Sequence, residues 1–218
     1  MKKIFMAYRY TQLTPLFTGW LTILLAGVIG MALAVLLSFI RPLEYSSTTR
    51  ILITQELGAV DAYTASRSAE RIADDLASVV YTSTFFDKVM ASGYSIDPTY
   101  FSDDAIKLRT QWKKAVEASV SRSSGLLSIA AFHPDVDQAE QLAQAVAYVL
   151  TTQGWTYTSG GNITVQVVDA PLNSRYPVRP NLLINGFSGL ALGLLGGAGY
   201  LLISAERSRR RHHFMHEE

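Results

Sequence analysis

The chain has 218 residues and a formal net charge of +1, and 49% of its residues are hydrophobic. This composition is too apolar for an average soluble domain and indicates membrane-spanning segments. Residues 41–181 carry 12 Lys and Arg against 15 Asp and Glu, which argues against nucleic acid as a partner. Cysteine is absent, so disulfide bonds are excluded.

Two uncharged apolar runs are long enough to cross a membrane. Residues 16–40 form a run of 25 residues and residues 182–204 a run of 23, and a hydrocarbon core of about 30 Å needs about 20 residues in a helix. The first run ends in Ser38-Phe39-Ile40-Arg41-Pro42 without a small-residue cleavage site, so we interpret it as a retained anchor and not as a signal peptide.

Basic residues flank both runs on their outer sides. Lys2, Lys3 and Arg9 precede the first run, and four arginines between residues 207 and 211 follow the second. By the positive-inside rule, residues 1–15 and the basic tail 205–218 are expected in the cytoplasm. Residues 41–181 are then expected outside it.

Periodic patterns in the middle segment predict one extracytoplasmic α+β domain. A β-branched strand is expected first, then three helices, a hairpin with a turn at residues 123–125, a strong helix, and a last strand. The ranges are 45–54, 69–80, 84–93, 98–114, 116–120, 126–132, 135–154 and 163–168. The order β-α-α-α-β-β-α-β suggests a mixed sheet with helices packed on one face.

A proline-rich segment, residues 169–181, joins the last strand to the second run. Its marker residues are Pro171, Tyr176, Pro177, Pro180 and Asn181. Proline fixes φ near −65° and donates no hydrogen bond, so we expect a stiff, extended linker. Such a linker would hold Arg175 and Arg179 near the bilayer, which makes them candidates for contact with lipid headgroups or glycan.

These features occur together in an order that resembles a known family. They are the basic N-terminus with its apolar run, Arg41-Pro42-Leu-Glu-Tyr45 before the first strand, the hairpin and helix from Leu126 to Ala145, and the segment from Asp169-Ala-Pro171 to Pro180-Asn181. The set resembles the polysaccharide co-polymerases, the Wzz-type chain-length determinants of bacterial surface-glycan synthesis. The resemblance covers nearly the whole chain.

The resemblance implies a homo-oligomeric ring in the bacterial inner membrane. It also implies a polysaccharide polymerase and its lipid-linked glycan as partners, alongside membrane lipids. The extracytoplasmic domain is shorter than in members that control long O-antigen. The chain has no G-x-x-x-x-G-K-[ST] loop, so it is not expected to be an ATP-using kinase itself. It looks like the short members whose tyrosine kinase is a separate cytoplasmic polypeptide, which makes such a kinase a candidate partner.

Small residues recur every four positions in both apolar runs. They are Ala26, Gly30 and Ala34 in the first and Gly189, Gly193 and Gly197 in the second. This spacing is typical of a flat face on which another helix packs closely, although glycine is also common in membrane helices generally. We expect the two helices to pack against each other and against neighbouring subunits. Asn185 is expected to hydrogen-bond between helices or at the interface.

No catalytic, cofactor-binding or metal constellation is predicted. Asp135 is placed to cap a helix, and Asp137 two residues later faces elsewhere, so these residues and His133 do not indicate a metal site. The adjacent Asp74 and Asp75 point in different directions and make a poor acid/base pair. Ser123-Ser124-Gly125 reads as a turn and not as a nucleophile elbow.

The sequence therefore predicts a non-enzymatic scaffold that regulates chain length, polymerisation or export of a surface polysaccharide such as O-antigen, capsule or exopolysaccharide. The chief alternative is a two-span sensor or adaptor that activates a separate cytoplasmic kinase or transducer. A membrane-anchored hydrolase is disfavoured, because no nucleophile, base or metal cluster is recognisable.

Overall fold

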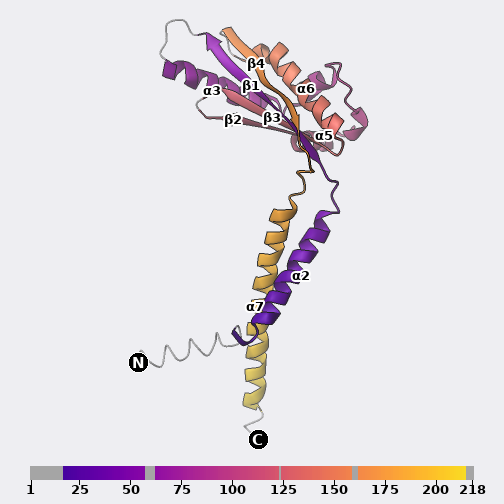
Figure 1. Cartoon of the computed structure of the whole chain (residues 1–218), viewed down its shortest axis with the longest axis vertical. Helices are drawn as coiled ribbons and strands as arrows, with labels where there is room; N and C mark the ends of the chain where they lie inside the picture. Colours follow the sequence, from indigo (N-terminus) through magenta and orange to yellow (C-terminus); the bar gives the residue numbers. More distant parts are fainter. Residues whose placement is uncertain (1–16, 57–61, 123, 159–161, 215–218) are drawn as a thin grey trace. The chain divides into compact units, whose positions relative to one another are not determined.

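The computed structural model describes residues 17–56, 62–122, 124–158 and 162–214 (Figure 1). The chain divides into two compact units. Leu43–Arg179 form the first, called the folded unit below, and the segments before and after it form the second, called the helix unit. The folded unit lies within two residues of the predicted bounds 41–181 at each end.

The folded unit is built on one four-stranded sheet with the order β2-β3-β1-β4 (Figure 1). Its strands are β1 (Tyr45–Glu56), β2 (Val116–Ser121), β3 (Leu126–His133) and β4 (Asn162–Asn173). The predicted α+β class is confirmed. However, every neighbouring pair of strands is antiparallel, which corrects the prediction of a mixed sheet.

The helical connections give the physical reason for this correction. Each one joins two strands that run in the same direction, as a βαβ unit does. A third strand lies between the two in both cases: β3 separates β1 from β2, and β1 separates β3 from β4. The parallel neighbours that the element order suggested are therefore never in contact, and the arrangement is a split βαβ topology.

Two long helices, α3 (Ala62–Val79) and α6 (Val136–Gln153), pack on the sheet. Ile51 and Ile53 of β1 are fully buried, whereas Arg50 and Thr54 on the opposite face are exposed. This alternation confirms that the helices cover one face. Each buried isoleucine contributes about 1.5–3 kcal/mol relative to an exposed one.

Shorter helices close the core between α3 and β2. They are α4 (Ser83–Met90) and α5 (Ala105–Ala115), and single 3₁₀ turns lie at Pro98–Tyr100 and Gly154–Tyr157. Trp112 of α5 is only 1% exposed, and its Nε1 donates a 2.7 Å hydrogen bond to the carbonyl of Val80. The largest core side chain therefore also ties α5 to the end of α3.

Helix caps agree with the sequence at one end and differ at another. Asp135 caps α6 by accepting a 2.8 Å hydrogen bond from the amide of Asp137, as predicted. The helix predicted over residues 84–93 begins earlier, because Thr82 is the N-cap of α4 and accepts from the amide of Phe85. The helix expected over residues 98–114 is also divided, since α5 begins only at Ala105.

Strand β4 takes up the first part of the predicted linker. It continues to Asn173 and includes Pro171, so the segment between sheet and helix is shorter than 169–181. Pro171 is tolerated because β4 is an edge strand and its pairing with β1 is irregular on both sides of Arg50. In this irregular stretch, the hydroxyl of Thr49 donates a 2.7 Å hydrogen bond to the carbonyl of Asp169.

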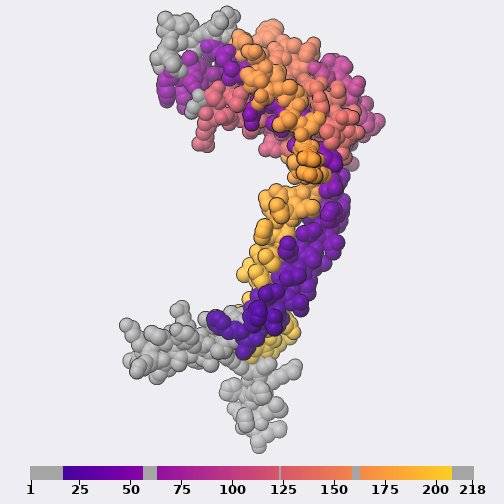
Figure 2. All heavy atoms as spheres, viewed as in Figure 1, coloured from indigo at the N-terminus to yellow at the C-terminus, as the bar shows by residue number. Residues whose placement is uncertain are grey.

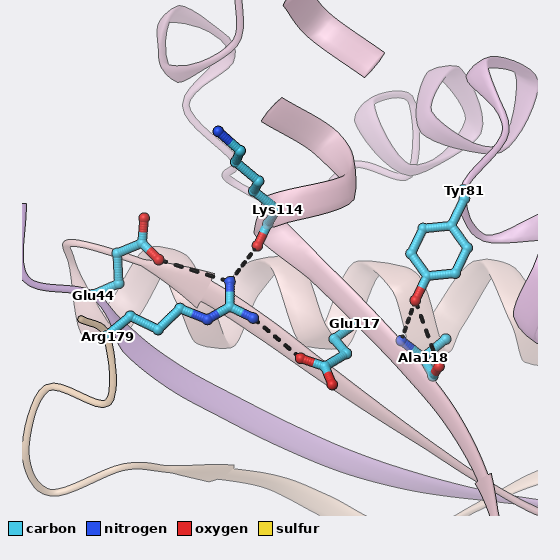
Figure 3. Close-up of polar contacts among 6 residues, drawn as sticks. All are labelled: Glu44, Tyr81, Lys114, Glu117, Ala118 and Arg179. Atoms are coloured by element: carbon cyan, nitrogen blue, oxygen red, sulfur yellow. Dashed lines mark hydrogen bonds and ion pairs between the residues drawn. The ribbon is translucent and has the colours of Figure 1, made fainter. Parts of the chain in front are cut away.

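The opposite edge of the sheet is β2, where a tyrosine side chain meets the strand. The hydroxyl of Tyr81 accepts a 2.8 Å hydrogen bond from the amide of Ala118. The same hydroxyl lies 3.5 Å from the carbonyl of Ala118 (Figure 3). One side chain thus engages both backbone groups of this edge residue.

The helix unit consists of α2 (Trp20–Ser38) and α7 (Leu182–Phe214), which lie side by side (Figures 1 and 2). Both contain a stretch long and apolar enough to cross a membrane, Trp20–Ser38 and Leu182–Arg207. Helix α7 runs to Phe214, so helix continues through residues 205–214 of the predicted tail. The predicted cytoplasmic segment 1–15 lies outside the described residues.

Candidate functional site

The small residues of the two apolar helices face each other within one chain. Contacts place Gly197 beside Ala26, Gly193 beside Ala26 and Gly27, and Gly189 beside Gly30 and Ala34. A Cβ atom at Gly30 would lie 2.5 Å from the carbonyl oxygen of Gly189. No side chain fits there, so the backbones are as close as glycine permits.

A hydrogen bond joins the same two helices at one end of this stripe. Nδ2 of Asn185 donates to Oγ of Ser38 at 2.8 Å, and that hydroxyl donates to the carbonyl of Ala34 at 2.8 Å. Ser38 is 6% exposed. Interhelical bonds of this kind contribute about 0.6 kcal/mol in a membrane, and the predicted interhelical role of Asn185 is confirmed.

The remaining faces of both helices are apolar and uncovered. Large exposed side chains occur along α2 and along α7 as far as Ile203, among them Leu21, Leu25, Leu36, Leu183, Leu192 and Leu195. An isolated soluble protein rarely exposes so much contiguous apolar surface. Lipid or other helices must therefore cover it.

In the folded unit, polar contacts converge on Arg179 (Figure 3). Its Nη1 donates to the carbonyl of Lys114 at 2.7 Å, its Nη2 donates to Oε2 of Glu117 at 3.1 Å, and Oε2 of Glu44 lies 3.9 Å from Nη1. The guanidinium carbon stacks 3.4 Å from the ring centre of Phe132. These five residues are called the Arg179 cluster below.

Backbone hydrogen bonds also connect the segment around Glu44 to the segment that ends at Arg179. The amide of Glu44 donates to the carbonyl of Arg179 at 2.9 Å, and the amide of Val178 donates to the carbonyl of Glu44 at 2.8 Å. Farther along, the amide of Ser174 donates to the carbonyl of Ser46 at 2.7 Å. The outgoing segment, residues 174–179, therefore stays paired with the start of β1 after β4 has ended.

The rings of a histidine and a tyrosine contact each other at a tilted angle near this cluster. The rings of Tyr100 and His133 are 4.3 Å apart, and Nδ1 of His133 accepts a 3.0 Å hydrogen bond from the amide of Asp135. Burial lowers the pKa of His133, although the carboxylates of Asp135, Asp97 and Glu44 oppose this. Burial, followed by the charge of Glu44, raises the pKa of Tyr100. Both rings are neutral at pH 7.

Arg175 and Arg179, which the sequence analysis named together as candidate contacts, have different surroundings in the structure. Arg175 is exposed, and its guanidinium lies 5.8 Å from the ring centre of Tyr176. Arg179 is instead held at the surface of the folded unit by the contacts above, with 36% of its side chain exposed. The side chain of Tyr176 is 70% exposed, and Asn181 caps α7 by accepting from the amide of Ile184 at 3.1 Å.

Sequence reasoning missed the partners of Arg179. Glu44 belongs to the recognised motif before β1, but its role was not predicted. The alternation of β2 places Glu117 on the face away from the helices, yet this does not identify its partner. Phe132 was assigned to β3 without a function. Only long-range pairing brings these residues together.

Acidic and histidine side chains form no metal cluster among the residues that the structure describes. Asp135 and His133 are engaged in the start of α6, as described above. A polar hollow of about 490 Å³ lies along α3 and is lined by Thr64, Arg67, Ser68, Glu70, Arg71 and Asp74. Arg67 is paired there with Glu70 at 3.2 Å.

Two helices with the length and composition of membrane spans lie before and after one α+β unit, which is consistent with a two-pass membrane protein that has a folded middle domain. Within this class, residues 13–93 match the family model of the Wzz chain length determinant protein. This match confirms the resemblance that the motifs indicated. No curated protein matches this chain.

Proposed function

We propose that this chain is an oligomeric scaffold of the bacterial inner membrane that regulates the chain length, polymerisation or export of a surface polysaccharide. The observation that carries the proposal is the Wzz match over residues 13–93, which spans the first apolar helix, β1, α3 and α4. The polysaccharide polymerase and its lipid-linked glycan are the proposed partners. A ring of subunits would limit how far the neighbouring polymerase extends its glycan.

The decisive experiment is deletion of the gene, followed by gel analysis of the surface glycan. The proposal expects an altered length distribution or yield that the full chain restores when supplied from a plasmid. An unchanged distribution and yield in the deletion strain would refute it.

The proposed topology places both termini in the cytoplasm and the folded unit outside it. Basic residues outside both apolar helices support this orientation. The natural chain has no cysteine, so Ser119→Cys on the exposed face of β2 supplies a single thiol. A membrane-impermeant maleimide should label this thiol in spheroplasts. Labelling that requires disruption of the membrane would show the opposite orientation.

The proposed homo-oligomer is supported by the uncovered apolar faces of α2 and α7. The small-residue stripe is already occupied by the partner helix of the same chain, so neighbouring subunits would use other helix faces or the folded unit. Native mass measurement of the full chain in lipid nanodiscs should give a single multiple of the 24.0 kDa chain mass. A monomer at all protein concentrations would contradict the scaffold.

Two further contacts belong to this proposal. Arg175 is free to meet anionic lipid headgroups or glycan, because the structure gives its guanidinium only the ring of Tyr176 as a partner among the described residues. A separate cytoplasmic tyrosine kinase would bind the cytoplasmic ends of the chain. Co-purification of such a kinase with the full chain, lost on removal of residues 205–218, would test the second contact.

A further inference from the structure

Arg179 occupies a special place in the chain. It is the last residue of the folded unit, Pro180 is the first residue of the following segment, and α7 begins at Leu182. Whatever holds Arg179 therefore fixes the point from which the chain continues into the second apolar helix.

The side chain of Arg179 is held from several directions at once. Its partners are the end of α5 at Lys114, strand β2 at Glu117, strand β3 at Phe132 and the incoming chain at Glu44. The two hydrogen-bonded partners are 65 and 62 residues away in sequence. A guanidinium stays charged at all physiological pH values and binds through a rigid planar fork, so these contacts define one position of the side chain.

The backbone of Arg179 is held together with its side chain. Its carbonyl accepts from Glu44, and its amide lies 3.3 Å from the carbonyl of Glu44. Glu44 is the second residue of the folded unit, after Leu43. The Arg179 cluster therefore fastens the incoming and outgoing segments to each other and to the body of the sheet.

We propose that Arg179 is a positioning residue that fastens the outgoing segment, residues 174–179, to the folded unit, and that length control requires this fastening. The inference rests on the proposed function for its second part. It assigns Arg179 a role different from headgroup contact, because the guanidinium is already engaged by protein groups. Arg175, four residues earlier and exposed, provides a matched control.

The first test is amide hydrogen exchange of the full chain in nanodiscs. The amides of Ser174 and Val178 report on the outgoing segment, since both donate to the incoming segment or β1. Arg179→Gln is expected to accelerate their exchange by about tenfold or more, while exchange in β3 and α6 stays unchanged. Arg175→Gln should leave all of these rates unchanged. Equal rates in Arg179→Gln and the parent chain would overturn the proposal.

Arg179→Lys separates geometry from charge. Lysine keeps the positive charge but cannot donate to two partners through one planar group or stack in the same way. It should therefore accelerate exchange of Ser174 and Val178 nearly as much as glutamine does. If lysine instead preserves slow exchange and normal glycan length, charge alone suffices and the positioning role is wrong.

The second test uses surface-glycan length in the deletion strain, with each variant at matched membrane abundance. Arg179→Gln and Arg179→Lys should broaden the length distribution and lose its preferred length, and Lys107→Gln, at an exposed basic residue of α5, should restore the parent distribution. A normal distribution in the Arg179 variants, in a strain where deletion alters it, would overturn the link to length control. Failure of the proposed function would appear differently, as no effect of the deletion itself, and the exchange experiment would still judge the attachment.

Discussion

Gly193 offers a sharp test of the helix pair, because the same helix contains a matched glycine in open space. A Cβ atom at Gly193 would lie 2.9 Å from Cα of Gly27 and still closer to the carbonyl oxygen of Ala26, whereas nothing lies within 4 Å of a Cβ at Gly196. Both Gly→Leu changes remove the same helix penalty of glycine, which is about 0.8–1 kcal/mol relative to alanine. Their difference therefore isolates packing between α2 and α7.

Leucine at Gly193 cannot fit without separating the helices. Overpacking of a close interface costs about 1–3 kcal/mol, which corresponds to about 5- to 150-fold in the ratio of separated to packed helices. Gly193→Leu should therefore weaken the helix pair and assembly in detergent without preventing membrane insertion. Gly196→Leu should behave like the parent chain.

Disulfide trapping measures this separation directly. The chain has no cysteine, so Val35→Cys with Gly186→Cys introduces one pair at facing positions, where a Cβ at Gly186 would lie 3.4 Å from Cγ2 of Val35. Oxidation should give an intrachain crosslink in high yield, and adding Gly193→Leu should reduce that yield while adding Gly196→Leu should not. Size-exclusion chromatography of the cysteine-free variants reports on assembly. Equal crosslinking and equal oligomer size for both leucine variants would refute the reasoning.

The other predictions concern the folded unit. Trp112→Phe should lower the free energy of unfolding by about 2–4 kcal/mol, because it shrinks a core side chain and leaves the carbonyl of Val80 without its donor. Denaturant titration of the full chain in detergent measures this free energy, and a change below about 1 kcal/mol would contradict the prediction. Tyr81→Phe should accelerate amide exchange at Ala118 and cost about 0.5–1.5 kcal/mol, while slow exchange there would show that another group protects the amide. Burial lowers the pKa of His133 in the folded chain, so the unfolded chain takes up the proton first as the pH falls below about 6.5. The free energy of unfolding should therefore decrease from that pH until the lowered pKa is passed. His133→Asn should flatten this pH dependence, and an unchanged slope would assign it to another group.

Local patterns predicted the elements of the folded unit but not their neighbours. Alternation and capping residues located β1, β3 and α6, because side-chain period and N-cap chemistry are properties of a few adjacent residues. Which strands pair is decided by packing across the whole unit, so the fully antiparallel sheet was not foreseen. Pro171 shows the same limit, since its place within a strand depends on β4 being at an edge.

The candidate sites show a similar division. The four-residue spacing of Gly189, Gly193 and Gly197 identified a packing face, because that spacing alone defines one side of a helix. The role of Arg179 could not be inferred in this way, since Glu44 and Glu117 approach it only after distant segments have paired. Its position in a proline-rich segment suggested proximity to lipid, whereas its side chain is engaged by the folded unit.

The two edge strands of the sheet, β2 and β4, are both protected against backbone pairing with another copy of the chain. Proteins in a membrane diffuse in two dimensions and meet one another often, and an exposed edge strand would allow neighbouring copies to pair through backbone hydrogen bonds. Tyr81 obstructs one rim at Ala118, and Pro171 with its uneven pairing obstructs the other. In the proposed oligomer, contacts between copies would therefore rely on side chains, whose shapes can specify a partner and allow it to dissociate again.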